Sequence, residues 1–191
     1  HRRKLQVNRD HLLLFAGDVT QDQVLVNLGP DDAAQPLRLA NDDGGNAVAS
    51  DFPLFVDATS VVSGESNAFA AGDYTISETN LPGYSASFAG DCDANGDLTL
   101  AVGEDLTCTI TNDDIAPTLT VTKVVNNNDG GTAVAGDFTL YIDATEVANG
   151  DVNVLDAGSY VVSEADPGAG YIGSIGGDCD ANGNVTLNPG D

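Results

Sequence analysis

Basic residues are scarce in this chain, which has six lysines and arginines against 30 acidic residues and a formal net charge of −24. Five of the six bases lie within the first 38 positions, and only Lys123 follows them. Most of the molecule would therefore be repelled by a nucleic-acid backbone or an anionic membrane. This charge balance excludes nucleic acid as a partner. It suits a self-repelling surface or the binding of divalent cations.

Long apolar runs and catalytic motifs are also missing. The most apolar run, HLLLFAG over 11–17, is far too short to cross a membrane, so we expect no direct membrane insertion. The two histidines, His1 and His11, have no nucleophile arranged around them. No phosphate-binding loop, zinc-ligand spacing or nucleophile elbow occurs. We therefore predict that the protein is not an enzyme and requires no cofactor.

One long stretch is present twice. AGDYTISETNLPGYSASFAGDCDANGDLTL over 71–100 matches AGSYVVSEADPGAGYIGSIGGDCDANGNVTL over 157–187. A repeat of this length is the size of a small domain, and short alternating runs punctuated by Gly and Asn are typical of β structure. The sequence thus predicts an all-β chain of three parts. These are an N-terminal extension over 1–35, a β-sandwich repeat over 36–116 and a second repeat over 117–191 that lacks its last strand.

The missing strand is evident from the two endings. Copy one continues into EDLTCTITNDD over 104–114, whereas copy two reaches Asp191 at the equivalent place. A sandwich without this strand has an open edge and an uncovered stripe of core. Residues beyond Asp191 would fill the gap, or a neighbouring subunit would fill it by β-strand addition.

The N-terminal extension contains two short segments that could act as such a donor strand. KLQVN and QVLVNL alternate apolar and polar residues and resemble the closing strand TCTITNDD. The first nine residues carry four positive charges and no acid, which would attract them to the acidic body of another subunit; a solvated tail is the alternative. We therefore predict a head-to-tail polymer of identical subunits, with the donor residues Leu5, Val7, Asn8, Val24, Val26 and Asn27.

The three cysteines indicate an oxidising, extracellular location. Cys92 and Cys108 bracket a loop that a disulfide would close, with a stabilisation of about 3 kcal/mol; two buried thiols are the alternative. Cys179 has no partner within its own repeat. An unpaired cysteine in a secreted protein indicates a missing segment or an intermolecular bond.

Two acidic turns offer oxygen ligands for a metal ion. Carboxylates at alternate positions around a Gly turn can wrap Ca²⁺, although the acid that closes an EF-hand loop is missing in both copies. A tight Asn-Gly turn with solvated acids is the favoured reading. If calcium binds, the alternative function is a calcium- or glycan-binding adhesin that contacts a host or neighbouring cell. The ligands would be Asp91, Asp93, Asn95 and Asp97, and in the second copy Asp178, Asp180 and Asn182.

A motif of Gly, Tyr, Glu, Pro, Gly and Tyr occurs in both copies. It resembles the prealbumin-like, Cna-B or SpaA-like repeat of bacterial surface proteins and pilins. The resemblance implies two tandem immunoglobulin-like or prealbumin-like sandwiches that serve at the cell surface as a stalk, adhesin or filament subunit. The matching residues are Gly72, Tyr74, Glu78, Pro82, Gly83 and Tyr84, and Gly158, Tyr160, Glu164, Pro167, Gly170 and Tyr171.

The resemblance also implies an isopeptide bond between a Lys on the first strand and an Asn on the last, assisted by the motif Glu. Copy one has Glu78 and Asn112, but its first strand, around Arg38, has no Lys, so no such bond is expected there. Copy two has Lys123 and Glu164 but no Asn on a final strand. An intermolecular cross-link would need a donated Asn. The alternative is a Lys that extends to solvent and a Glu that caps backbone amides.

Overall fold

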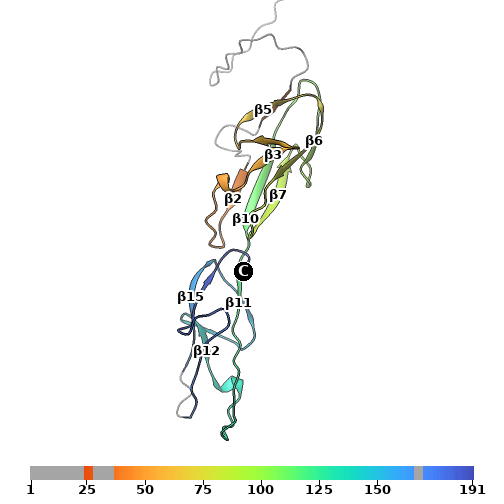
Figure 1. Cartoon of the computed structure of the whole chain (residues 1–191). Coiled ribbons are helices and arrows are strands. Elements are labelled where there is room, and N and C mark those ends of the chain that lie inside the picture. The colour runs from red at the N-terminus through yellow and green to blue at the C-terminus, as the bar shows by residue number, and fades with distance from the viewer. Residues whose placement is uncertain (1–23, 28–36, 166–169) are drawn as a thin grey trace, which may run out of the picture.

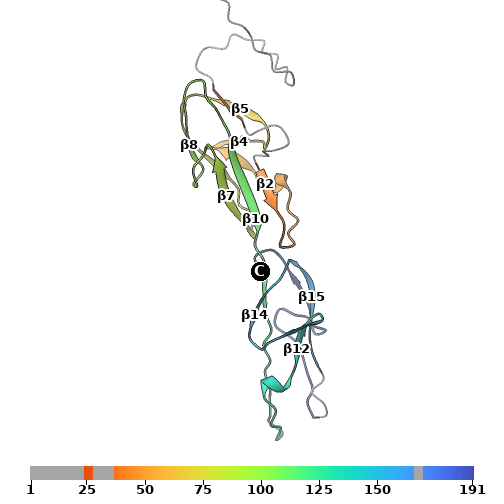
Figure 2. The same cartoon turned by 180° about the vertical axis from the view of Figure 1, so that it is seen from behind.

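The computed structural model describes residues 24–27, 37–165 and 170–191. Figures 1 and 2 show two β-sandwiches stacked end to end in an elongated molecule, with the C-terminus at the junction between them. The all-β prediction and the tandem organisation are confirmed. Among the described residues, no helix is long and apolar enough to cross a membrane.

The first repeat consists of three sheets that enclose one core. Their strand orders are β5-β1-β9, β2-β10-β7 and β4-β3-β6-β8. A 3₁₀ turn, η1 (Ala49–Asp51), precedes β3. The strands are β1 (Val24–Asn27), β2 (Leu37–Ala40), β3 (Leu54–Val56), β4 (Thr59–Val61), β5 (Ser66–Phe69), β6 (Gly72–Glu78), β7 (Tyr84–Gly90), β8 (Asp97–Leu100), β9 (Asp105–Leu106) and β10 (Cys108–Asp114).

Alternation of side chains explains why these segments form a closed sandwich. Successive side chains of a strand point to opposite faces, so one face of each strand reaches the core. In β3 and β8 the buried residues alternate with exposed or half-buried ones. The core of the first repeat includes Phe52, Leu54, Val56, Ile76, Leu98, Leu100 and Ile110.

Strand β1 belongs to the first sandwich, although sequence analysis placed it in the N-terminal extension. It pairs antiparallel with β5 and parallel with β9. Its counterpart in the second repeat, β11 (Thr118–Thr120), pairs in the same way with β14 (Val152–Val154). The alternating apolar residues of Val24–Asn27 therefore supply the first strand of the first repeat.

The second repeat has the same first half, and its described residues up to Asp191 form two sheets. Its strands form the sheets β11-β14 and β13-β12-β15-β16, and η2 (Ala135–Asp137) is the counterpart of η1. Residues 171–177, which align with β7, form no strand in the described structure. The remaining strands are β12 (Leu140–Ile142), β13 (Thr145–Val147), β15 (Gly158–Glu164) and β16 (Asn184–Leu187).

Backbone hydrogen bonds connect the two repeats. The N–H of Ile115 donates to the carbonyl of Gly83 (2.9 Å), and that of Gly190 donates to the carbonyl of Ile115 (2.7 Å). On the other side of the junction, the N–H of Ala157 donates to the carbonyl of Asp43 (2.6 Å). These three bonds hold the connector and the adjoining loops of both repeats together.

A tyrosine fixes equivalent loops in the two repeats, over 41–47 in the first and over 127–133 in the second. The Tyr84 hydroxyl accepts a hydrogen bond from the N–H of Ala47 (3.0 Å) and donates to Oδ1 of Asn41 (3.1 Å). The Tyr171 hydroxyl makes the equivalent bonds in the second repeat, to Ala133 and Asn127. These shared contacts set the structural alignment of the two repeats.

Replacing Tyr84 by Phe is expected to destabilise the first repeat by about 1–3 kcal/mol, because it leaves a buried N–H without an acceptor. Hydrogen exchange of the intact chain, resolved by peptide, would show faster exchange over the first repeat. Tyr171→Phe is the matched control and should act on the second repeat alone. If either variant changed hydrogen exchange equally in both repeats, the idea that each tyrosine stabilises only its own repeat would be wrong.

Candidate functional site: the open groove of the second repeat

Strand β10 fills, in the first repeat, a place that the described residues of the second repeat leave open. It is the central strand of its sheet, parallel to β2 and antiparallel to β7. Its alternate residues face inward and are almost completely buried, with exposed fractions of 3% or less. These four residues are Cys108, Ile110, Asn112 and Asp114.

Each inward residue of β10 has a distinct partner. Cys108 forms a disulfide with Cys92, as predicted, and Ile110 packs in the core. The side-chain amide of Asn112 donates to Oε2 of Glu78 (2.9 Å). The carboxylate of Asp114 accepts hydrogen bonds from the backbone N–H groups that follow β2. The last strand is therefore held by a covalent bond, an apolar contact and two polar contacts.

A groove occupies the equivalent place in the second repeat. Its cavity volume is about 490 Å³, and its lining includes residues 119–124, residues 174–176 and Cys179. Leu140 and Val162 belong to both its lining and the core of the second repeat. A second cavity of about 400 Å³ shares Lys123, Glu164 and Ser174 with the groove and extends it toward Tyr171. The open edge predicted from the sequence thus corresponds to two neighbouring cavities that share lining residues.

Lys123 and Glu164 lie where the two cavities meet. The Lys123 ammonium is hydrogen-bonded to Oε2 of Glu164 and lies 4.2 Å from the ring centre of Phe138. Their side chains are only 15% and 19% exposed. The structural alignment places Lys123 at the position of Leu37, which is 3% exposed in the first repeat. Copy one thus has a leucine where copy two has its only lysine, which agrees with the sequence analysis. The proposed cross-link at Lys123 stays a prediction.

Cys179 is a free, half-buried thiol at the edge of the groove. Burial raises the pKa of this thiol, and the neighbouring Asp178 and Asp180 raise it further. At neutral pH the sulfur is therefore held as the thiol, which is the less nucleophilic form. An intermolecular bond at Cys179 stays a prediction.

The donor residues named from the sequence fall in two places. Val24, Val26 and Asn27 form β1, which has a partner strand on each side within its own chain. Leu5, Val7 and Asn8 lie outside the described residues. Because β1 is already paired, residues before it are the better candidates for a donor strand.

The acidic turns predicted to bind calcium are organised by hydrogen bonds within the turn. Oδ1 of Asp93 accepts from the N–H groups of Asn95 (2.8 Å) and Asp97 (3.0 Å), and these bonds lower the pKa of Asp93. Asp180 accepts from the side-chain amide of Asn184 and from the backbone N–H groups of Asn184 and Asn182, and these bonds lower its pKa. In the first turn, Asp91 accepts from the N–H of Thr107 and Asp97 from the hydroxyl of Thr75. The turn interpretation accounts for these side chains, and calcium binding by them, including Asp178, stays a prediction.

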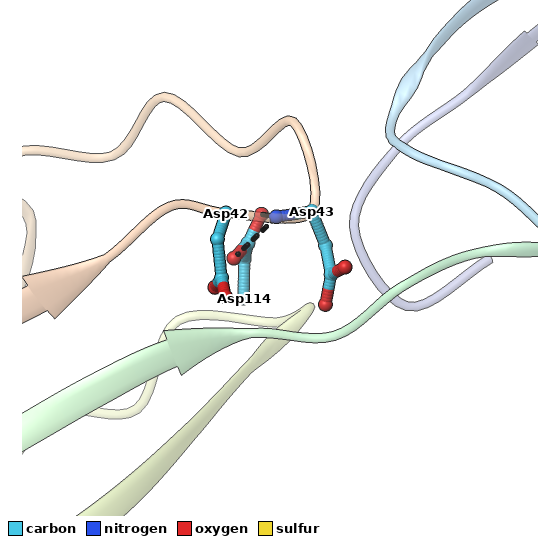
Figure 3. A group of neighbouring side chains, drawn as sticks. All are labelled: Asp42, Asp43 and Asp114. Atoms are coloured by element: carbon cyan, nitrogen blue, oxygen red, sulfur yellow. Dashed lines mark hydrogen bonds between the residues drawn. The ribbon is translucent and has the colours of Figure 1, made fainter.

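A further carboxylate group combines the acidic turn NDDGG over 41–45, which the sequence favours as a structural turn over a metal site, with a distant aspartate. Figure 3 shows Asp42 and Asp43 on the loop after β2, next to Asp114 at the end of β10, and their carboxylate oxygens lie within 4.8 Å of one another. Asp114 accepts from the N–H groups of Asp43 (3.1 Å) and Gly45 (2.6 Å). Burial and then the charge of Asp114 raise the pKa of Asp43. These oxygens are of the type that hold Ca²⁺. The NDDGG turn is evident in the sequence, but Asp114, whose carboxylate accepts hydrogen bonds from this turn, lies 69 residues or more away along the chain.

The comparison with known families agrees with the repeated motif. The family model for the SpaA-type prealbumin-like fold domain matches the chain twice, over residues 37–110 and 114–189. The chain belongs to the prealbumin-like fold domain family. No curated protein and no solved structure matches it.

Membership in the prealbumin-like family sets the general class of function. SpaA-type prealbumin-like domains are typical of bacterial pilins and extracellular surface proteins, and the family is structural rather than enzymatic. The family model covers most of both repeats. The second repeat is therefore a prealbumin-like domain that carries an open groove.

Proposed function

We propose that this chain is a structural subunit of an extracellular, pilus-like fibre, in which a neighbouring copy donates a strand to the second repeat. The groove beside Lys123 and Cys179 carries this proposal. In the first repeat the same position is filled by β10, which buries four side chains. The open repeat therefore has a large apolar and polar surface that an added strand would cover.

The donor in this proposal is the segment before β1 in the next subunit. Asn8 and Asp10 are two residues apart, as are Asn112 and Asp114 of β10. Residues 1–9 are basic, and from Leu39 onward the chain carries 25 acids and one base, so the two surfaces attract each other. An asparagine delivered to the groove would lie beside Lys123 and Glu164, the pair that an intermolecular cross-link requires.

The hydrogen-bonded junction supports a mechanical role. Because backbone hydrogen bonds join the two repeats at the connector, each subunit would add both sandwiches to the length of a fibre. The disulfide of the first repeat closes that sandwich covalently. A calcium- or glycan-binding adhesin is the alternative function, and the group of Asp42, Asp43 and Asp114 is the observation that favours it.

Deleting residues 1–22, which leaves β1 in place, is expected to abolish assembly because it removes the donor. Sedimentation velocity and electron microscopy of the intact and truncated chains would measure the effect. The variant Asn8→Ala/Asp10→Ala in the full chain is the finer test and should weaken assembly at least tenfold.

Hydrogen exchange over the first repeat should be unchanged in the truncated chain, which controls for misfolding. The proposal is overturned if the truncated chain assembles like the intact one. It is also overturned if the intact chain remains a monomer at every concentration tested.

A further inference from the structure

We infer that the joint between the two repeats is held against the repulsion of its own carboxylates, so that it closes as salt screens them and loosens as the ionic strength falls. The acid that sets this response is Asp156 of the second repeat, whose charge acts on Asp43 of the first. The inference concerns a contact within a single chain. It therefore does not depend on whether the chain assembles into a fibre.

The joint contains a direct bond at the loop after β2. The N–H of Ala157 donates to the carbonyl of Asp43 (2.6 Å), and the N–H of Asp43 donates to the carboxylate of Asp114 (3.1 Å). Asp114 is the last inward-facing residue of β10 and is only 3% exposed. Two consecutive hydrogen bonds thus connect the second repeat to a buried residue of the first.

The two backbones approach closely at this bond. Gly44 has a φ of 86°, and a Cβ atom on it would lie 2.5 Å from the carbonyl oxygen of Ala157, closer than non-bonded atoms allow. On the other side of the connector, a Cβ atom on Gly83 would collide with the carbonyl oxygen of Pro189. Glycine has no side chain to bury, so these contacts add little hydrophobic stabilisation that could outweigh a repulsion.

Five aspartates gather at the joint. Asp42 and Asp43 lie on the loop after β2, and Figure 3 shows them beside Asp114, with carboxylate oxygens within 4.8 Å of one another. Asp113 precedes Asp114 on β10, and Asp156 belongs to the second repeat. The charges that act on Asp43 are those of the other four aspartates, and all of them are negative. Closing the joint therefore brings a further negative charge to a group that is already acidic.

Basic residues are too few to offset this charge. From Leu39 onward the chain has one base, Lys123, and its ammonium is hydrogen-bonded to Glu164. Like charges repel, and the repulsion between exposed groups falls as salt shortens the Debye length, from about 30 Å at 0.01 M to about 3 Å at 1 M. Repulsion across the joint is therefore strongest at low ionic strength.

The side chain of Asp156 is not required by the fold of its repeat. The carbonyl of Asp156 accepts from the Tyr160 hydroxyl (2.8 Å), as the carbonyl of Ala70 accepts from the Tyr74 hydroxyl (2.9 Å) in the first repeat. The two positions are thus equivalent, but the first repeat has alanine where the second has aspartate. The exposed carboxylate of Asp156 adds charge at the joint and no contact that the strand needs.

Loosening of the joint would leave both sandwiches folded. Each repeat has its own cluster of buried apolar residues, and no residue is shared between the two clusters. The bond between Ala157 and Asp43 would open first, because it lies among the aspartates. The bonds of Ile115 to Gly83 and Gly190 would continue to hold the connector, which would then act as a hinge.

Amide hydrogen exchange of the full chain, followed by NMR in the presence of EDTA, tests the inference at the bond itself. We expect the protection factor of the Ala157 amide to rise about threefold between about 0.01 M and about 1 M sodium chloride, as screening of exposed charges predicts. The amide of Val162, which donates to the carbonyl of Gly183 within the second repeat, is the internal reference and should not change. A parent chain whose Ala157 amide is equally protected at both salt concentrations would overturn the inference.

A pair of variants assigns the response to one carboxylate. Asp156→Ala introduces the residue that the first repeat has at this position. It should raise the protection of the Ala157 amide at low salt to the high-salt value and remove most of the salt dependence. Asp151→Ala is the matched control, since it removes an exposed aspartate of the same repeat whose charge does not act on Asp43, and it should behave like the parent chain. If Asp156→Ala kept the full salt dependence of the parent chain, repulsion across the joint would not be its cause.

Calcium separates screening from the binding of an ion. In a buffer of low ionic strength without EDTA, micromolar calcium chloride adds almost no screening and should leave the protection of the Ala157 amide unchanged. If calcium at this concentration closed the joint and sodium chloride did not, an ion held by Asp42, Asp43 and Asp114 would be responsible. The inference would then be wrong, and the alternative function as a calcium-binding adhesin would gain support.

Discussion

Replacing both Cys92 and Cys108 by serine is expected to lower the free energy of unfolding of the first repeat by about 3 kcal/mol. The disulfide joins the last strand to the turn before β8 and closes a loop with a sequence separation of 16. Without it, the unfolded first repeat gains conformational freedom. For a domain of this size, about 3 kcal/mol corresponds to a decrease in Tm of about 12–24 °C.

Calorimetry of the intact chain would measure this decrease, and peptide-resolved hydrogen exchange would assign it to the first repeat. Cys179→Ser is the matched control, because it removes a thiol without breaking a bond and should leave the first repeat unchanged. An unchanged Tm for the double variant would mean that β10 is held by its apolar and polar contacts alone.

Features carried by local sequence pattern were predictable. The alternation in β6 and β15, the paired cysteines and the repeated motif each depend on residues close together in the chain, and the structure has them where expected. Aligning the two copies shows that the given sequence reaches Asp191 before the counterpart of β10. The family match confirms the fold that the motif implied.

Features that depend on long-range pairing were not predictable. Val24–Asn27 is followed by an insertion relative to the second repeat, so alignment alone could not place it beside β5 and β9. The short hairpins after β3 and β12 turn at Asp57 and Asp143, which have φ of 51° and 53°. Aspartate tolerates this left-handed conformation better than most residues, but its presence alone is a weak signal. The long-range contact of Asp114 likewise became visible only in the folded chain.

Replacing Glu78 by Gln is expected to stabilise the first repeat by about 1–3 kcal/mol at neutral pH. Burial raises the pKa of Glu78, and the hydrogen bond from Asn112 opposes this only in part. Within the described structure, Oε1 of Glu78 and Oδ1 of Asn112 are buried without a hydrogen-bond partner. A neutral group at position 78 could donate to Oδ1 of Asn112 while it still accepts from that residue's N–H. Glutamine supplies this donor at every pH.

The sign of the pH dependence follows from the raised pKa. The folded state binds the Glu78 proton more tightly than the unfolded state, so protonation stabilises the fold fully below the ordinary carboxyl value of 4.5. This contribution is lost as the pH rises through the higher pKa of the folded state. The advantage of Glu78→Gln over the parent chain should therefore be small at low pH and reach a plateau near neutral pH. Tm measured for both chains between pH 3 and 8 gives the difference directly, because the other acids titrate equally in each.

The second repeat provides a control of opposite sign. Glu164 is the counterpart of Glu78, but its carboxylate is paired with Lys123. Glu164→Gln removes the charge that compensates a largely buried ammonium, so the second repeat should become less stable. The two glutamates differ in effect because one repeat has Leu37 where the other has Lys123. If both substitutions changed stability in the same direction, the effect of the motif glutamate's charge would not depend on whether Leu37 or Lys123 lies beside it. The idea that Lys123 and Glu164 form a stabilising charged pair in the groove would then be wrong.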